Sequence, residues 1–496
     1  MRRLLAGTLL ALLLVSCRGT GGHRAAGPSG ADILPITGTW VNLAWKDVRN
    51  QYTNPAGVPM TDPALWRTKV QEWKDLGLEY LVLMEVANEG EAFYPSDVMP
   101  HAYPAGQESP VEAILSEASA QGMKVFLSTG WAVNQDEDIR KPEIQARQQQ
   151  IMEELTALFT DSPAFYGWYL PVEDCITPVF PESAVAAVNR LVEKARALTP
   201  GKKTLISPYG MVYAQYDRPD FARNIRNLKV DIIAYQDEVG CVREPFPMRR
   251  LKEHWKRLRE VHEGSGIELW ANCETFTWEK GTNDRSSALI PAAYSRLLAQ
   301  QIAASEGGVS RIVSFMFGGI LEKPGSPYAL GQPVESERAW RDYRAWKDGC
   351  PYWQRVQESL RGTLVGAVPA SCPAWPRLTD GVLAEMDPED SAWEVFPAGS
   401  RSLALEWAEP ALVERVLVRC LDLARWEVLP PSRVTVCDGE GRLLAVEQFT
   451  APANNRHDAW IDFLEIPLQA AGPVNRLVLS FETDHKVCID EIYVNP

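Results

Sequence analysis

The sequence predicts an α/β protein, a (β/α)8 TIM barrel followed by an all-β jelly-roll-type sandwich. Two observations support this prediction. Across residues 36–317, about eight short apolar runs alternate with helical patterns, as in a parallel barrel. From residue 364 onward the helical period disappears, and turn residues separate short runs of β type. A chain of 496 residues is also longer than one core usually accommodates.

The barrel prediction depends on the order of its elements. The strand-like runs are residues 36–43, 80–84, 124–128, 166–170, 204–207, 231–235, 268–271 and 311–317. The helical patterns between them have apolar residues near a 3.6-residue period and cover 66–76, 111–121, 144–159, 184–198, 221–227, 248–261 and 291–304. A doubly wound open sheet is the alternative, but repeated strand–helix units favour a closed barrel.

A last helical stretch, residues 335–360, ends the barrel, so we place this domain at 33–362 and the sandwich at 363–496. The β runs of the second domain are 402–407, 412–419, 433–436, 443–448, 460–466, 476–481 and 487–494.

The first residues predict export. Arg2 and Arg3 precede an apolar stretch, 4–15, that is too short to span a bilayer and is typical of a signal peptide. The following residues, up to Cys17, resemble a bacterial lipobox, so residues 1–17 are the expected signal and Cys17 the lipidated residue. Residues 18–32 are rich in Gly and Ala and are expected to form a flexible tether. We therefore expect a protein anchored to the bacterial cell envelope, at the outer membrane or the periplasmic face, that meets the membrane through its lipid only.

Composition narrows the function further. The net charge of −15 argues against nucleic acid as a partner, because phosphates require a basic surface. Apart from Cys17, eight cysteines remain, and their spacing matches no metal site. An even number permits disulfides, although buried thiols are equally compatible with it.

Two glutamates are the candidate catalytic residues. Counting strands places Glu173 after the fourth run and Glu274 after the seventh. Loops at the carboxyl ends of barrel strands carry catalytic groups in this fold, so the two carboxyls should converge there. Glycosidic-bond hydrolysis needs such a pair, about 5–5.5 Å apart in retaining enzymes and 6.5–9.5 Å apart in inverting ones. An oligo- or polysaccharide is the expected substrate, and this chemistry needs no cofactor.

Other polar and aromatic residues at strand ends are candidates for substrate binding. Carboxylates there also cap helices or form salt bridges, and Trp and Tyr also fill barrel–helix interfaces. The candidates are Trp40, Asn42, Trp45, Glu85, Trp131, Tyr209, Tyr235, Asp237, Glu238, Asn272, Phe276 and Trp278.

The barrel resembles a known family on the segments 166–173 and 270–274. It is similar to exported bacterial proteins that are classified as a domain of unknown function and grouped with TIM-barrel glycoside hydrolases. The resemblance to the large clan of retaining glycosidases implies that Glu173 is the acid/base and Glu274 the nucleophile or base. That clan usually has Asn directly before the acid/base, where this chain has Val172.

Two other readings remain open. Chitinase-type barrels, which use the substrate acetamide as nucleophile, also place a Glu after strand four and a Tyr-Asp-like pair after strand six, matched here by Tyr235 and Asp237. Pro171 stands where those enzymes have a supporting Asp. A non-catalytic glycan-binding surface lipoprotein would share the aromatic residues and the lipobox, and would differ in whether the two glutamates converge.

The charge states follow from expected surroundings. We expect Trp168 and Tyr169 to enclose Glu173 and keep it protonated, because desolvation disfavours a charged carboxylate. We expect Glu274 to stay ionised, held by a hydrogen bond from Tyr235.

The sandwich resembles the discoidin-like, galactose-binding-like family at Leu378-Thr379-Asp380-Gly381 and in the closing run 489–494. Many members of that family hold a structural calcium ion near the first of these segments. The resemblance implies a possible calcium site with Asp380 and Glu491 as ligands, since calcium prefers oxygen.

Overall fold

The computed structural model describes residues 32–44, 57–133, 137–241, 248–280, 287–331, 333–449, 460–470 and 472–496. Residues 33–496 form one compact unit. Among the described residues, no helix has the length and apolar character needed to cross a membrane.

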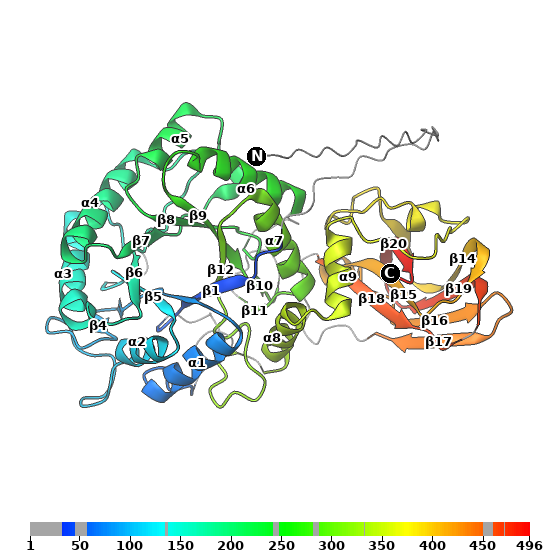
Figure 1. The fold of residues 1–496 in the computed structure, drawn as a ribbon, viewed down its shortest axis with the longest axis horizontal. Coiled ribbons are helices and arrows are strands. Elements are labelled where there is room, and N and C mark those ends of the chain that lie inside the picture. The colour runs from blue at the N-terminus through cyan, green and yellow to red at the C-terminus, as the bar shows by residue number, and fades with distance from the viewer. Residues whose placement is uncertain are drawn as a thin grey trace, which may run out of the picture. The chain divides into compact units, whose positions relative to one another are not determined.

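Eight parallel strands close into the predicted barrel (Figure 1). In chain order they are β1 (Ile36–Val41), β2 (Tyr80–Leu83), β5 (Lys124–Ser128), β6 (Phe165–Tyr169), β7 (Lys203–Ile206), β8 (Ile232–Gln236), β9 (Glu268–Glu274) and β12 (Arg311–Phe315). The first strand pairs with both the second and the eighth, which closes the ring. The open-sheet alternative is therefore excluded.

Helices cover the outside of the ring (Figure 1). They are α1 (Pro63–Asp75), α2 (Pro110–Ala120), α3 (Pro142–Phe159), α4 (Glu182–Leu198), α5 (Pro219–Arg226), α6 (Met248–His262), α7 (Tyr294–Gly307) and α8 (Pro333–Lys347). Local sequence fixes several starts: Ser109 and Glu112 form a reciprocal capping box on α2, and Pro occupies the first turn of α1, α2, α3 and α5.

The expected helix at 335–360 is wrong in one respect, because it is two helices. A second helix, α9 (Pro351–Leu360), follows α8 after a break. Gly349 has φ +76°, and Pro351 cannot continue a helix because it lacks the N–H that the preceding turn requires.

Short elements complete the barrel domain. The hairpin of β3 (Ala87–Asn88) and β4 (Glu91–Ala92) follows the second barrel strand, and the hairpin of β10 (Phe276–Trp278) and β11 (Leu289–Pro291) follows the seventh. A short 3-10 turn, Met211–Tyr213, follows the fifth strand. These segments lie at the carboxyl ends of the strands and shape the mouth of the barrel.

Side chains fill the barrel interior. The rings of Tyr80 and Trp270 pack edge to face with their centres 5.2 Å apart, and the Arg311 guanidinium carbon lies 4.4 Å from the Tyr80 ring centre. Close strand contact requires Gly167 in β6, because a Cβ there would come within 2.4 Å of the Lys203 carbonyl oxygen. This packed interior leaves the chemistry to the loops at the strand ends.

The second domain is the predicted β-sandwich. One sheet has the order β13-β20-β15-β18 and the other β14-β19-β16-β17. The strands are β13 (Glu394–Phe396), β14 (Gly399–Ala411), β15 (Arg415–Asp422), β16 (Arg433–Asp438), β17 (Leu443–Gln448), β18 (Trp460–Pro467), β19 (Val474–Thr483) and β20 (Val487–Val494), with 3-10 turns at Pro376–Thr379 and Ala424–Trp426. The strand β13 was missing from the sequence prediction.

One sheet of the sandwich is buried on both faces. In β15, Val416, Val418 and Cys420 belong to the core between the sheets, whereas Leu417 and Leu421 belong to a cluster shared with the barrel domain. This alternation is the period-two pattern of a strand. Helix α9 contributes a hydrogen bond from the Tyr352 hydroxyl to the Phe463 carbonyl oxygen at 3.1 Å.

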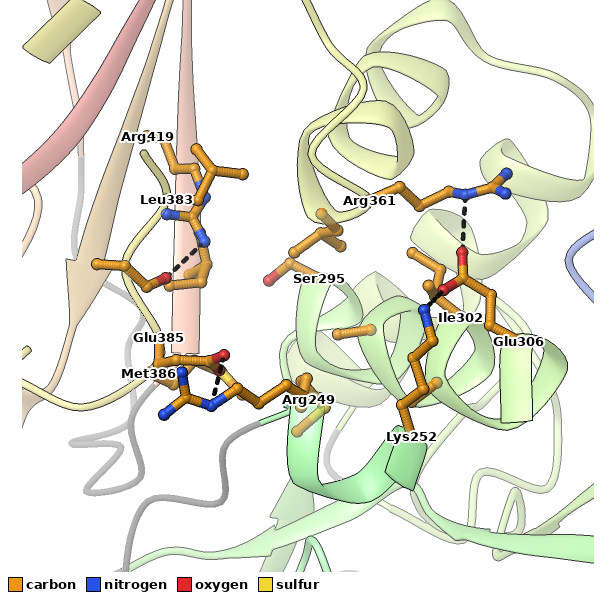
Figure 2. Close-up of a pocket in the computed structure, with 16 residues that line it drawn as sticks. Arg249, Lys252, Ser295, Ile302, Glu306, Arg361, Leu383, Glu385, Met386 and Arg419 are labelled. Atoms are coloured by element: carbon orange, nitrogen blue, oxygen red, sulfur yellow. Dashed lines mark hydrogen bonds and ion pairs between the residues drawn. The ribbon is translucent and has the colours of Figure 1, made fainter. Parts of the chain in front are cut away.

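A cavity of about 230 Å³ lies where α6, α7 and α9 meet the sandwich. Figure 2 shows the charged residues around it. Arg249 forms a salt bridge with Glu385 at 3.6 Å, and Glu306 forms salt bridges with both Lys252 and Arg361. On the sandwich side, Arg419 donates to the Ala384 carbonyl oxygen at 3.0 Å and pairs with Asp490. Of these ion pairs, the one between Arg249 and Glu385 joins the two domains.

Candidate functional site

A cavity of about 440 Å³ opens among the loops at the carboxyl ends of four successive strands. These strands are β5, β6, β7 and β8, the third to sixth of the barrel. The lining residues are Trp131, Glu137, Asp138, Ile139, Arg140, Pro171, Val172, Glu173, Asp174, Tyr209, Gln236, Glu238 and Cys241. Carboxylates and aromatic rings thus share one cavity at the end of the barrel where this fold carries its chemistry.

Glu173 lies in the wall of this cavity, after the fourth strand, and is exposed. The expected enclosure of its carboxyl is wrong. The Trp168 indole points to the helices and donates to the Thr199 hydroxyl at 2.8 Å, and Tyr169 lies inside the barrel, edge-on to Trp40 at 5.7 Å. The Tyr169 ring is still close enough to the following loop for the charge of Glu173 to add to the burial that raises the Tyr169 pKa. The Glu173 side chain itself is exposed, so the expected desolvation is absent.

Glu274 is the last residue of the seventh strand and is only 4% exposed. Its pKa is raised to about 8, mainly because burial disfavours the charged form and secondly because Asp237 lies nearby. Its carboxyl accepts the Cys241 N–H at 2.8 Å, and the Cys241 thiol lies 3.3 Å from its other oxygen. Glu274 therefore tends to hold a proton at neutral pH, the opposite of the ionised state that the sequence suggested.

The expected hydrogen bond from Tyr235 to Glu274 is also wrong. The Tyr235 hydroxyl lies 3.0 Å from Nε2 of His262, in α6, so this side chain points outward between strand and helix. Residues 232–236 are apolar on both faces, so the sequence pattern did not reveal which face Tyr235 occupies.

Asp237 and Glu238 follow the sixth strand and differ in exposure. Asp237 is fully buried and accepts from the Gln300 amide at 2.7 Å and from the Glu274 N–H at 3.1 Å. Burial raises its pKa. Glu238 lines the cavity, has φ +56°, and has a pKa raised by burial. A left-handed backbone at a non-glycine residue is strained and is common at functional sites.

The cavity contains charged residues that the sequence reasoning missed. Arg140 donates to Asp138 at 2.8 Å and to Asp174 at 2.9 Å, which links the loops after the third and fourth strands. The Glu137 carboxylate accepts the Val133 N–H at 2.6 Å, and burial raises its pKa. Of these residues, Asp174 could have been found from the sequence, because it directly follows Glu173 after the fourth strand. Residues 137–140 could not, because they lie in an irregular segment outside any periodic pattern.

The aromatic candidates separate into two groups. Trp131 and Tyr209 line the cavity, and Tyr209 is 40% exposed. In contrast, Trp40, Phe276 and Trp278 are 2%, 5% and 8% exposed, so they are interior residues and offer no open face to a sugar. Trp45 lies outside the described residues.

The remaining polar candidates are structural supports. The Glu85 carboxylate accepts the main-chain N–H groups of Leu43 and Ala44, both at 2.5 Å. The Asn42 side chain accepts the Ala44 N–H at 3.1 Å, and the Asn272 amide donates to the Ser207 hydroxyl at 3.1 Å. Glu85, Asn42 and Asn272 are all buried and do not line this cavity, and their role in substrate binding stays a prediction.

The two calcium candidates come from different elements: Asp380 directly follows the 3-10 turn Pro376–Thr379, and Glu491 lies in β20. The Gly381 N–H donates to the Glu491 carboxylate at 2.9 Å, and the Val382 N–H donates to Asp380 at 2.8 Å. Across the described residues, no three His, Cys, Asp or Glu side chains gather in an arrangement that could hold a metal ion. Two carboxylates alone do not make up a calcium shell of six to eight oxygens.

The cysteines and the N-terminal segment were also the subject of sequence predictions. The eight cysteines from Cys175 to Cys488 are all unpaired, so none of them forms a disulfide. Cys17 and the predicted signal and tether lie outside the described residues.

The fold and the cavity define a (β/α)8-barrel protein with carboxylates gathered at the carboxyl-end mouth. Residues 36–328 match the model of the Domain of unknown function DUF4434, and the chain belongs to this family. Comparison with curated proteins gave no match.

Solved structures share the fold. A crystal structure of a protein from Bacteroides thetaiotaomicron VPI-5482, assigned as an alpha-L-fucosidase, is 16% identical, with a TM-score of 0.50, and the alignment covers 67% of this chain and 99% of that one. A glycoside hydrolase family 5 structure from Bacteroides vulgatus ATCC 8482 is 10% identical, with a TM-score of 0.40, covering 92% of this chain and 89% of that one. At these identities the likeness concerns the fold alone.

Proposed function

We propose that this protein is a glycoside hydrolase that cleaves an oligo- or polysaccharide in the cavity at the carboxyl end of the barrel. One observation carries the proposal: an exposed Glu173 follows the fourth strand in the cavity wall, and a buried Glu274 with a raised pKa ends the seventh strand, behind the wall and in contact with the lining residue Cys241. Two carboxyls in unlike surroundings are what acid- and base-assisted glycoside cleavage needs.

The surroundings of the two glutamates support a proposal in which their roles are the reverse of those that the sequence suggested. Glu274 has a raised pKa, so it serves as the acid and donates its proton to the leaving glycosidic oxygen. Glu173 faces the cavity and serves as the nucleophile toward the anomeric carbon or as the base that takes a proton from water. The separation of the two carboxyls in the substrate complex, which distinguishes retention from inversion, stays a prediction.

The cavity lining fits a sugar. Tyr209 offers a partly exposed ring and Gln236 a polar amide, whereas Trp131 lines the cavity but is only 3% exposed. Aromatic faces pack against the C–H surfaces of sugars, while amides and carboxylates bind hydroxyl groups. The barrel likeness to a structure assigned as an alpha-L-fucosidase is in keeping with this substrate class.

The chitinase-type alternative has less support. It requires a carboxylate after the sixth strand that reaches the substrate acetamide, and Asp237 is instead buried, with hydrogen bonds from Gln300 and Glu274. The two-carboxylate mechanism therefore remains the proposal.

The decisive experiment is an assay with a panel of aryl glycosides and polysaccharides. Wild type should hydrolyse at least one of them, and Glu173→Gln and Glu274→Gln should each lower kcat by about 10²- to 10⁴-fold, the range for loss of acid–base catalysis. Glu182→Gln, an exposed carboxylate on α4, is the matched control and should keep wild-type activity. Binding of a glycan without hydrolysis of any substrate would instead identify a non-catalytic glycan-binding protein.

We further propose that the protein acts at the cell envelope, held by a lipid on Cys17. Such a location would place the cavity where extracellular or periplasmic glycans are available.

A further inference from the structure

Cys241 joins the cavity lining to Glu274. It lines the cavity, and both of its polar groups face the buried carboxyl: the N–H lies 2.8 Å from Oε2 and the sulfur 3.3 Å from Oε1. One residue thus contacts both oxygens of the proposed acid. No sequence motif marked this cysteine, because it lies in the irregular segment after the sixth strand.

The segment that carries Cys241 is pressed against the end of the seventh strand. A Cβ on the preceding residue, Gly240, would come within 2.5 Å of the Phe276 carbonyl oxygen and 3.0 Å of Glu274 Oε2. Only glycine fits this approach, so the sequence Gly240-Cys241 allows the backbone N–H to reach the carboxylate. The close approach of Gly240 to Phe276 and Glu274 is an observation separate from the thiol contact. Both observations place Cys241 against the Glu274 carboxyl.

We propose that Cys241 is a positioning residue for Glu274, with its N–H and S–H holding the carboxylate that remains after Glu274 gives its proton to the substrate. This inference rests on the proposed hydrolase function. Donors aimed at the charged form of an acid favour proton release, and this effect is strong where water is excluded.

Other charged or titratable groups also face Glu274. Asp237 accepts its N–H, and Glu238 and Cys273 lie close enough to interact with its charge or with that of Asp237. The Arg296 guanidinium donates to the Glu274 carbonyl oxygen at 2.7 Å. Cys241 differs from these groups because its contacts are to the carboxyl oxygens themselves, so its removal should act on the proton of Glu274 directly.

The first test needs no substrate. Iodoacetamide labelling of each cysteine, read by peptide mass spectrometry across pH 7–10, reports the thiolate at Cys241. Burial, and after it the neighbouring Glu274 carboxylate, raise the pKa of this thiol, so wild type should react slowly. Above about pH 8, where Glu274 is ionised, Glu274→Gln removes its negative charge and should raise the labelling rate of Cys241 several-fold at a fixed pH. Cys175, in the loop after the fourth strand, and the Glu182→Gln variant are the controls and should show no change.

The second test uses the pH dependence of kcat/KM. Cys241→Ala removes the S–H donor, so the pKa of Glu274 should rise and the alkaline limb should move to higher pH, with kcat about tenfold lower, as expected for one hydrogen bond to a charged group. Cys241→Ser keeps a donor and should restore the limb. A purely structural cysteine would lower activity without moving the limb.

The two tests separate this inference from the proposed function. If no glycoside is hydrolysed but Glu274→Gln still changes labelling at Cys241, the hydrolase proposal fails and the Cys241–Glu274 contact stands. Labelling that is identical in wild type and Glu274→Gln would overturn the inference, as would an alkaline limb that stays in place in Cys241→Ala.

Discussion

Asp237 Oδ1 accepts the main-chain N–H of Glu274 at 3.1 Å, so carboxylates at the ends of two neighbouring barrel strands are joined through the backbone. Both carboxyls are buried, and burial raises the pKa of each. Two such groups are poorly able to ionise together in a low-dielectric interior, so the pair retains a proton that solvent-exposed carboxylates would lose. This retained proton is the basis of the proposed acid role.

The raised pKa predicts a cost in stability. Below about pH 4.5, the ordinary pKa of a glutamate side chain, Glu274 is protonated in both the folded and the unfolded state. Between that pH and about 8, the unfolded chain loses the proton while the folded protein keeps it, so the folded state becomes relatively less stable as pH rises. Glu274→Gln removes this cost.

The expected result is a higher Tm for Glu274→Gln than for wild type at pH 8 to 9, with a free energy difference of at least about 1.4 kcal/mol, the equivalent of one pKa unit. The difference should disappear near pH 4. Thermal unfolding of both proteins across pH is the measurement, with Glu182→Gln as control. If Glu274→Gln is less stable than wild type at pH 9, the hydrogen bonds and charges around the ionised Glu274 carboxylate offset the free-energy cost of its burial, and the prediction is wrong.

At a second buried charged group, around Lys69, we expect a substitution to lower stability, whereas Glu274→Gln should raise it. Lys69, in α1, is 1% exposed and contacts both Glu72 and Glu322, whose carboxylates are also buried. Lys69→Met would leave both carboxylates without their cation, and breaking a buried ion pair costs about 3–5 kcal/mol.

The neighbouring pair of Lys323 and Asp75 provides the matched control. It has a similar separation, 2.7 Å, but both side chains are exposed, so Lys323→Met should change stability by at most about 1 kcal/mol. Chemical denaturation of the two variants compares the sites. Equal losses would mean that burial does not determine the strength of these pairs.

The order of the barrel strands could be predicted from the sequence because each run is short, apolar and followed by a helical pattern. The positions of Glu173 and Glu274 after the fourth and seventh strands followed from that count and are confirmed. The inside and outside faces of the strands could not be predicted in the same way. Barrel strands are apolar on both faces, so Trp40 inside the ring and Tyr235 outside it look alike in sequence.

The exposure and protonation of the site carboxyls could also not be predicted from the sequence. Whether a carboxyl is exposed depends on loops that pack against it, and Cys241 and Glu137 lie in segments without periodic pattern. The sequence therefore located the two glutamates along the chain but did not reveal that Glu274 is buried, with a raised pKa, while Glu173 is exposed.

The calcium prediction has a direct test. The pKa of Glu491 is raised to about 7, chiefly by burial, so a calcium ion at Asp380 and Glu491 would bind better above pH 7, where the carboxylate is ionised. We expect the full chain to melt at a higher temperature with calcium than with chelator at pH 8, since a ligand that binds only the native state stabilises it. Asp380→Asn should abolish the shift. The same melting curve in both conditions would remove the calcium prediction.

The lipid anchor is tested by fractionation. Wild type should partition with membranes, and Cys17→Ser should release the protein or leave its signal peptide uncleaved, because the thiol is the site of lipidation. Cys175→Ser, which leaves the lipobox intact, is the control. A soluble wild-type protein whose mature chain begins elsewhere would contradict the lipobox reading.

The most direct test of the central claim is the pH dependence of kcat/KM for the first substrate that is hydrolysed. If Glu274 is the acid, it must hold its proton, so kcat/KM should fall as pH rises through about 8. If Glu274 were the nucleophile, it would have to be ionised, and kcat/KM would instead rise through the same pH. A falling alkaline limb near pH 8 that is absent in Glu274→Gln supports the account, and a rising limb there contradicts it.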